Sequence, residues 1–203
     1  EPATALTDYL LAAVSACCWL RLWRTSGRRQ LGALLFFAGF AAAAACGGTW
    51  HGFYSGESAA PGLLWWLTLA CAGVASSGLA VVGLERLGCR DAKKLLTGSA
   101  VFLAVHSAYV WWDRRFLVSV VVSGAATTLC LAGLLVHARQ RPHGGAAMAA
   151  AGLVLSVSGA VLQQYRVAIH RVHFDHNATY HLWLLAAAVL FHAGNRRIAR
   201  DGD

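Results

Sequence analysis

The polar side chains best suited to metal or proton chemistry lie near the ends of long apolar stretches. The chain has nine histidines and nine acids in 203 residues. Asp8, His51, His106, His176 and His181 each fall at or near the end of such a stretch. Imidazole and carboxylate groups bind zinc and exchange protons. Because ionisable groups at membrane depth are expensive to bury, these positions are candidates for a functional site.

Zinc is the metal that this set of side chains fits best. A catalytic zinc site takes three protein ligands and keeps a position for water. His51, His181 and one of His176 or Asp8 would supply that number of ligands. Bound zinc lowers the pKa of its water to about 7, which makes hydroxide available at neutral pH. Where Asp8 is not a ligand, it would act as a general base or orient a ligand histidine.

The spacing at the start of the last apolar stretch sets a condition on this site. His176 and His181 are five residues apart, so on an ideal helix they point about 140° away from each other. Both can face one metal only if His176 precedes the helix or a π-bulge intervenes. Residues four apart share a face, as His173 does with Asn177 and Asn177 does with His181. His173 and Asn177 are therefore additional candidates.

The stretches that carry these residues are apolar enough to cross a membrane. Hydrophobic residues make up 58% of the chain and charged residues only 13%, whereas a soluble domain has about 25% charged residues. An uncharged run of about 18 residues or more is typical of a spanning helix. The sequence predicts seven such helices in a single domain over residues 1–203. They cover residues 9–20 (with amphipathic flanks to about 5–24), 31–54, 61–84, 95–112, 116–136, 145–165 and 177–195.

Positive charge predicts the orientation. Thirteen of the seventeen lysines and arginines follow the first, third, fifth and seventh stretches. Cytoplasmic connections carry such an excess, so the N-terminus is expected outside and the C-terminus inside. We therefore expect an all-α, seven-helix bundle in a bacterial inner (cytoplasmic) membrane, with lipid as its partner. A nucleic-acid partner is not expected, because the cations flank apolar spans and form no binding motif.

This orientation gathers the candidate residues on the outer side. Asp8 begins the first stretch, His51 ends the second, and His106 lies in the outer half of the fourth, which makes it a further candidate. The last external loop and the start of the seventh stretch contribute His173, His176, Asn177 and His181. By contrast, His192 falls near a cytoplasmic end, where solvation at the membrane interface is the expected role.

Most candidates also have a simpler structural interpretation. Asp8, or Thr7 before it, could be a helix N-cap, and His51 could be an interfacial histidine. His106 could donate a hydrogen bond to a neighbouring helix, and His173 could be a solvated loop residue. His181 lies one turn inside an apolar run. A buried histidine there needs a partner, which favours a site.

Two short sequences resemble a known superfamily. The second stretch ends in GGTWHGF at 47–53, and the seventh begins with HNATYHLW at 176–183. With seven spans, these sequences resemble the CREST superfamily, which includes the alkaline ceramidases and the progestin/adiponectin-type receptors. The start LTDYL is also similar to that of uncharacterised bacterial seven-helix proteins. The resemblance implies a seven-helix bundle of the zinc-dependent, lipid-amide hydrolase type.

The resemblance also implies a ligand set. In that family one histidine of the second span and an HxxxH pair of the seventh span hold the zinc. Here the second-span histidine corresponds to His51, and the second histidine of HxxxH corresponds to His181. The first position of HxxxH is Asn177, with His176 displaced by one residue.

Two further positions of the family pattern differ in this chain. Gly47 stands where the family has a serine, four residues before the second-span histidine. Residues 62–84 contain no acid to match the family's third-span aspartate. Asp8 would then take that role from the first span.

Three functions remain open at this level. The first is an intramembrane zinc-dependent hydrolase acting on a lipid amide or ester. The second is a receptor-like or ligand-binding membrane protein with a structural metal site, and the third is a haem or proton-linked carrier. A retinal protein is excluded, because Lys93 and Lys94 are the only lysines and neither lies in the seventh stretch.

Overall fold

The computed structural model of the chain is all-α. It describes residues 1–26, 30–54, 61–141, 144–170 and 173–201. Each predicted stretch corresponds to one helix, which confirms the all-α prediction. The seven helices among these residues are α1 (Pro2–Ser26), α2 (Leu31–Phe53), α3 (Pro61–Arg86), α4 (Ala92–Trp112), α5 (Phe116–Gln140), α6 (Gly145–Gln164) and α7 (His176–Asp201).

Six helices, α1 to α6, are long and apolar enough to cross a membrane. This property indicates an integral membrane protein. The remaining helix, α7, has 26 residues and is as long as α3. Its apolar run is interrupted by polar residues, among them Asn177, His181 and His192. Two of these residues, Asn177 and His181, are among the candidate site residues.

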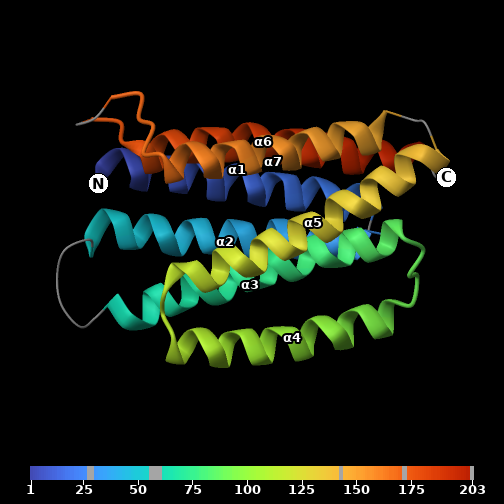
Figure 1. Ribbon diagram of the computed structural model, residues 1–203, viewed down its shortest axis with the longest axis horizontal. Coiled ribbons are helices and arrows are strands. Elements are labelled where there is room, and N and C mark those ends of the chain that lie inside the picture. The colour runs from blue at the N-terminus through green and yellow to red at the C-terminus, as the bar shows by residue number, and fades with distance from the viewer. Residues whose placement is uncertain (27–29, 55–60, 142–143, 171–172, 202–203) are drawn as a thin grey trace.

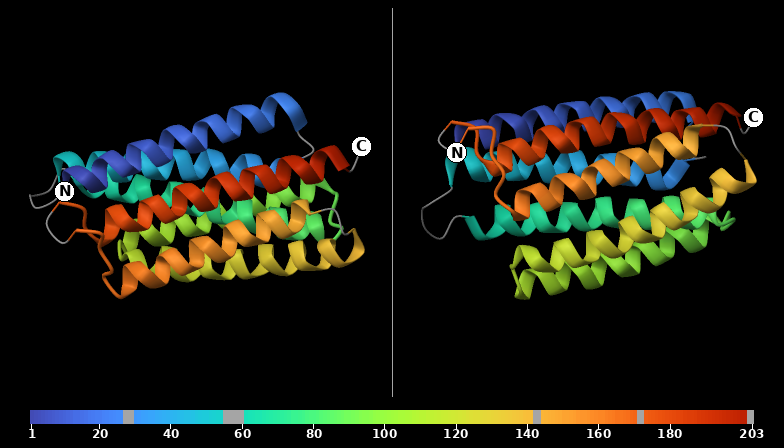
Figure 2. Two further views of the ribbon diagram at one scale, coloured as in Figure 1. Left: turned by 90° about the horizontal axis from the view of Figure 1, so that it is seen from above. Right: turned by 45° about the horizontal axis from the view of Figure 1, so that its top comes forward.

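The helices run roughly along the long axis of the molecule, side by side (Figure 1). Helix α1 packs against α2 and α7, α3 packs against α2, α4 and α5, and α6 packs against α7 and α5. Figure 2 shows α1 and α7 adjacent along most of their length. The N-terminus, the end of α2 and the start of α7 lie at one end of the bundle, called here the N-terminal end.

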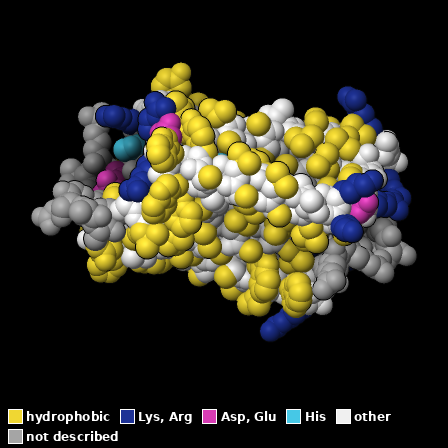
Figure 3. Space-filling model, turned by 90° about the horizontal axis from the view of Figure 1, so that it is seen from below, with side chains coloured by type: hydrophobic (Ala, Val, Ile, Leu, Met, Phe, Trp, Pro, Cys, Tyr) yellow, Lys and Arg dark blue, Asp and Glu magenta, His cyan; other side chains and the backbone are white. Residues whose placement is uncertain are grey.

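The exterior separates apolar from charged side chains. On the face shown in Figure 3, hydrophobic side chains cover the middle and basic side chains gather at the two ends. Val105 on α4 is 66% exposed, and Val121 on α5 is 63% exposed. A soluble monomer rarely exposes such a continuous apolar surface, whereas a bilayer covers it.

Small residues let the helices approach closely in the interior. Gly78 of α3 lies against the backbone of α2, where Phe36 and Gly32 pass. The core combines alanines with large side chains such as Phe37 and Phe191, which are almost fully buried. Close backbone packing of this kind supplies much of the stability of membrane bundles, in which lipid removes the hydrophobic drive between helices.

Gly78→Ala is expected to destabilise the bundle by about 1–3 kcal/mol, the usual cost of overpacking. A Cβ atom at Gly78 would overlap the backbone nitrogen of Phe36 and lie 2.7 Å from the carbonyl oxygen of Gly32. Thermal unfolding of detergent-purified protein, followed by circular dichroism, measures the loss. Gly98→Ala on α4 is the control, because a Cβ there meets nothing within 4 Å. Equal melting of the two variants would contradict the close packing of α2 on α3.

Candidate functional site

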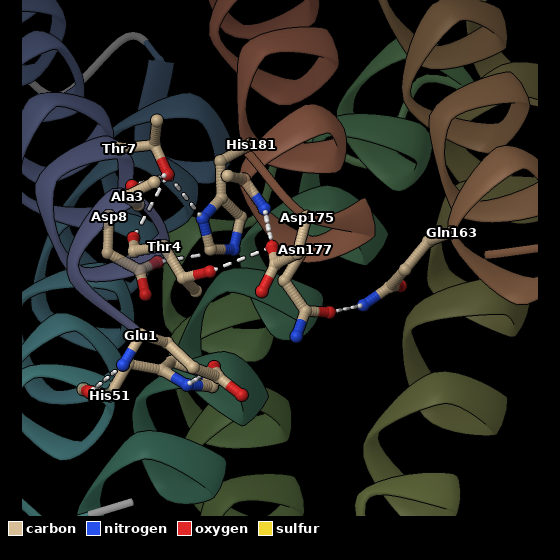
Figure 4. Close-up of polar contacts among 11 residues, drawn as sticks. Glu1, Ala3, Thr4, Thr7, Asp8, His51, Gln163, Asp175, Asn177 and His181 are labelled. Atoms are coloured by element: carbon tan, nitrogen blue, oxygen red, sulfur yellow. Dashed lines mark hydrogen bonds and ion pairs between the residues drawn. The ribbon is translucent and has the colours of Figure 1, made fainter. Parts of the chain in front are cut away.

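A cluster of polar side chains occupies the seam between α1 and α7 at the N-terminal end of the bundle (Figure 4). Thr4, Thr7 and Asp8 share one face of α1, because they are spaced three and four residues apart. His181 approaches them from the second turn of α7. Asp8 is 5% exposed and His181 is 8% exposed. The cluster is therefore shielded from both lipid and water.

His181 contacts α1 through both of its ring nitrogens. Its Nε2 lies 3.4 Å from Oδ1 of Asp8, and its Nδ1 lies 3.1 Å from Oγ1 of Thr7. The second carboxylate oxygen of Asp8, Oδ2, is buried and has no hydrogen-bond partner among the described residues. A buried acceptor without a partner costs about 1–3 kcal/mol, more for a charged group, so this oxygen requires an explanation.

The N-cap interpretation of Asp8 and Thr7 is wrong. Helix α1 begins at Pro2, earlier than the apolar core of the stretch indicated, so both residues lie inside the helix. The hydroxyl of Thr7 instead bonds back to the helix and lies 2.9 Å from the carbonyl oxygens of both Ala3 and Thr4. Asp8 is therefore an acid within an apolar helix rather than at its start.

Two glycines of α2 bring that helix against Asp8. A Cβ atom at Gly48 would lie 2.9 Å from Cβ of Asp8, so any side chain there would push α1 away. A Cβ at Gly47 would lie 3.6 Å from Oδ2 of Asp8 and 3.8 Å from Cγ2 of Thr68 on α3. The unpartnered oxygen thus faces the position where the resembled family has a serine.

His51 lies one helical turn beyond Gly47, at the end of α2. Its Nδ1 is 2.7 Å from the carboxylate of Glu1, and its side chain is 22% exposed. In Figure 4 the pair of His51 and Glu1 lies beside Asp8, and no dashed line joins it to His181. Within the part of the chain that the structure describes, no three His, Cys, Asp or Glu side chains are grouped closely enough to hold a metal.

His176 and His181 point to different sides of α7. The helix begins at His176 and continues as regular α-helix past His181. The arrangement that would let both histidines face one metal, with His176 before the helix or a π-bulge between them, is therefore not present. Of these two histidines, His181 is the one that the structure pairs with Asp8.

Asp175, directly before α7, holds the start of the helix in place. Its Oδ1 accepts the backbone N–H of Ala178 at 2.9 Å and the hydroxyl of Thr4 at 3.0 Å. Burial raises the pKa of this carboxyl, but these hydrogen bonds, together with the backbone N–H of Asn177 and the nearby His176, leave the pKa below its ordinary value. Asp175 therefore ties α7 to α1 as a charged group.

The three additional candidates lie apart from the cluster. Asn177 accepts a hydrogen bond at 2.9 Å from Gln163 of α6, and His173 is exposed in the loop before α7. His106 is buried, with its Nε2 3.2 Å from the carbonyl oxygen of Leu69 on α3. This contact confirms the structural interpretation of His106 as a hydrogen-bond partner of a neighbouring helix.

His192 is buried, and the expectation that it is solvated at the membrane interface is wrong. It packs edge-on against Phe37, and neither ring nitrogen has a hydrogen-bond partner among the described residues. Nearby, the fully buried Asn195 accepts a hydrogen bond from Arg86 at 3.2 Å through its side chain and one from Gln30 at 2.7 Å through its backbone. This second polar group clamps α2, α3 and α7 together at the other end of the bundle.

Sequence reasoning did not identify Thr4, Thr7 or Glu1 as neighbours of the candidate residues. The spacing of Thr4, Thr7 and Asp8 could have indicated the first two, because it places three polar groups on one face of an apolar helix. The contact of Glu1 with His51 joins positions 50 residues apart and left no local signal.

Comparison with known protein families gives a match over nearly the whole chain. The profile of a family of unknown function (DUF6962) matches residues 3–200, nearly the whole chain, so the chain belongs to that family. No curated protein and no solved structure matches the chain.

Proposed function

We propose that this member of the DUF6962 family is a seven-helix membrane protein that binds zinc at the seam of α1 and α7 and hydrolyses a lipid amide or ester. The observation that carries the proposal is the buried contact between Oδ1 of Asp8 and Nε2 of His181. This contact places a carboxylate and an imidazole side by side at a position where both are buried. Such a pair is costly to bury unless a proton or a cation lies between its members.

The separation of the two atoms favours a metal. A charge-assisted hydrogen bond between nitrogen and oxygen is about 2.7–2.9 Å long, whereas Asp8 and His181 are 3.4 Å apart. Two ligands at about 2.0–2.1 Å on a tetrahedral zinc ion are about 3.3 Å apart. The free Oδ2 of Asp8 supports the same conclusion, since a cation would stabilise the whole carboxylate.

His51 would complete the donor set. It lies on the turn of α2 that follows Gly47, and Gly47 faces Asp8. To reach the metal, its imidazole would exchange the carboxylate of Glu1 for the ion. His51, His181 and Asp8 would then supply three ligands, and a fourth position would remain for water.

The residues around the seam support hydrolysis of a lipid. Bound zinc would supply an acidic water and polarise a carbonyl group. Asp8 would accept the proton of that water through Oδ2, and Thr7 would hold the ring of His181. Leu11, Ala44 and Leu184 form an apolar layer around this part of the seam. They would exclude bulk water while the acyl chains of the substrate stay in the bilayer.

Metal content and turnover of the wild-type protein test this proposal together. We expect about one zinc per chain by elemental analysis of detergent-purified protein, and zinc-dependent hydrolysis of a synthetic ceramide or lipid ester. Protein without metal would contradict the proposal. Zinc-loaded protein that hydrolyses neither lipid would favour a binding or receptor-like protein with a structural metal.

We also propose that α7 spans the membrane, with the N-terminal end of the bundle outside the cytoplasmic membrane of a bacterium. The support is the excess of cations at the other end. An impermeant maleimide on intact cells should label a cysteine placed at Tyr165, which is exposed at the end of α6, and should not label Cys89. Each reporter is tested in a background without the other cysteines. Labelling of Cys89 alone would reverse the orientation.

A further inference from the structure

The contacts of the Thr7 hydroxyl bear on which ring nitrogen of His181 carries the proton. Oγ1 of Thr7 lies 2.9 Å from two backbone carbonyl oxygens, those of Ala3 and Thr4, and 3.1 Å from Nδ1 of His181. A hydroxyl has one hydrogen, and a carbonyl oxygen can only accept. Two of the three neighbours of this hydroxyl can only accept, and both are closer than the ring, so a carbonyl is the favoured acceptor of its hydrogen. The contact with His181 is then made by the ring, whose Nδ1–H donates to the oxygen of Thr7.

This assignment fixes the other side of the ring. A neutral imidazole carries one N–H, so a proton on Nδ1 leaves a lone pair on Nε2. Nε2 is the atom that faces Asp8. A lone pair directed at a carboxylate oxygen is repulsive by itself, and it becomes favourable when a cation or a proton lies between the two atoms.

We propose that Thr7 is a positioning residue that holds His181 as the Nδ1–H tautomer and directs its Nε2 lone pair toward Asp8. The tautomer is inferred from these contacts without any metal, whereas its effect on zinc affinity rests on the proposed function. Thr7 is 5% exposed, so water does not replace its hydroxyl. A hydrogen bond to the far nitrogen is the usual way in which proteins fix a ligand histidine.

Nitrogen-15 spectra of the histidine rings test the tautomer without any metal. Wild-type protein labelled with 15N-histidine should show His181 protonated on Nδ1, with the signal assigned through its absence in His181→Gln. Thr7→Val removes the hydroxyl at constant shape and should move the proton to Nε2 or give a mixture. Thr7→Ser restores the hydroxyl and should restore the wild-type pattern. An Nε2–H ring in the wild type, or an unchanged ring in Thr7→Val, would overturn the proposal.

Zinc affinity tests the consequence. Thr7→Val should bind zinc about 10–100-fold more weakly than the wild type, the usual effect of losing a group that orients a ligand. Thr7→Ser should bind nearly as well as the wild type. Thr128→Val on α5 is the matched control, because its hydroxyl also bonds back to its own helix, at 2.9 Å, but away from the seam. A change of tautomer without a change in affinity would overturn the positioning role. A wild type that binds no zinc would refute the proposed function and leave the spectra to decide the tautomer.

Discussion

His181→Ala protein is expected to lose its zinc on purification, with an affinity at least about 100-fold below that of the wild type. Losing only an orienting group typically costs about 10–100-fold, and His181 would be a direct ligand. His181 is 8% exposed and pairs with Asp8 across the seam. Elemental analysis and competition with a zinc-binding dye measure the loss.

Two further variants complete this experiment. His51→Ala should lose the metal as well, because the proposed site takes one ligand from α2. His192→Ala is the matched control, since His192 lies on the same helix and is equally buried but packs against Phe37 at the other end of the bundle. Retention of zinc in both His51→Ala and His181→Ala would refute the ligand assignment. Loss of zinc in all three variants would indicate unfolding, which circular dichroism would reveal.

The helices were predictable because the bilayer imposes a length and a polarity on each of them. Residues 31–54 and 61–84 were predicted as two spans, and they correspond to α2 and α3 with nearly the same ends. The extended start of α1 was harder to locate. Thr4, Thr7 and Asp8 interrupt the apolar pattern there, and they do so because they face α7 rather than lipid.

The end of the bundle at which the candidate site lies could be predicted from the sequence. The side of each helix that faces its neighbours could not. Hydropathy and charge placed Asp8, His51 and His181 at one end of the bundle, where the structure has them. Which face of each helix meets which neighbour depends on packing, such as the approach of α2 at Gly48. That packing brings Asp8 to His181 and leaves His176 apart. His192 was placed wrongly for a related reason, since its position near a helix end gave no sign that aromatic side chains cover it.

Asp8→Asn is expected to reduce lipid hydrolysis by about 10²–10⁴-fold, the usual contribution of a general acid or base. The substitution keeps the shape of the side chain and removes its charge. Because Asp8 is 5% exposed and its Oδ2 has no hydrogen-bond partner among the described residues, the neutral amide should be at least as easy to bury. We therefore expect the thermal stability of metal-free protein to be unchanged or higher while turnover is lost.

A loss of turnover without a loss of stability would distinguish a chemical role of Asp8 from a structural one. Asp113→Asn is the control, because Asp113 lies between α4 and α5 and pairs with Arg115 at 2.6 Å, away from the seam. It should leave turnover unchanged. A merely structural Asp8 would lose stability and activity together, or would tolerate asparagine in both respects. Full turnover of Asp8→Asn protein would remove Asp8 from the mechanism. Lost turnover with retained zinc would remove Asp8 from the ligand set and leave proton transfer as the task of its carboxylate.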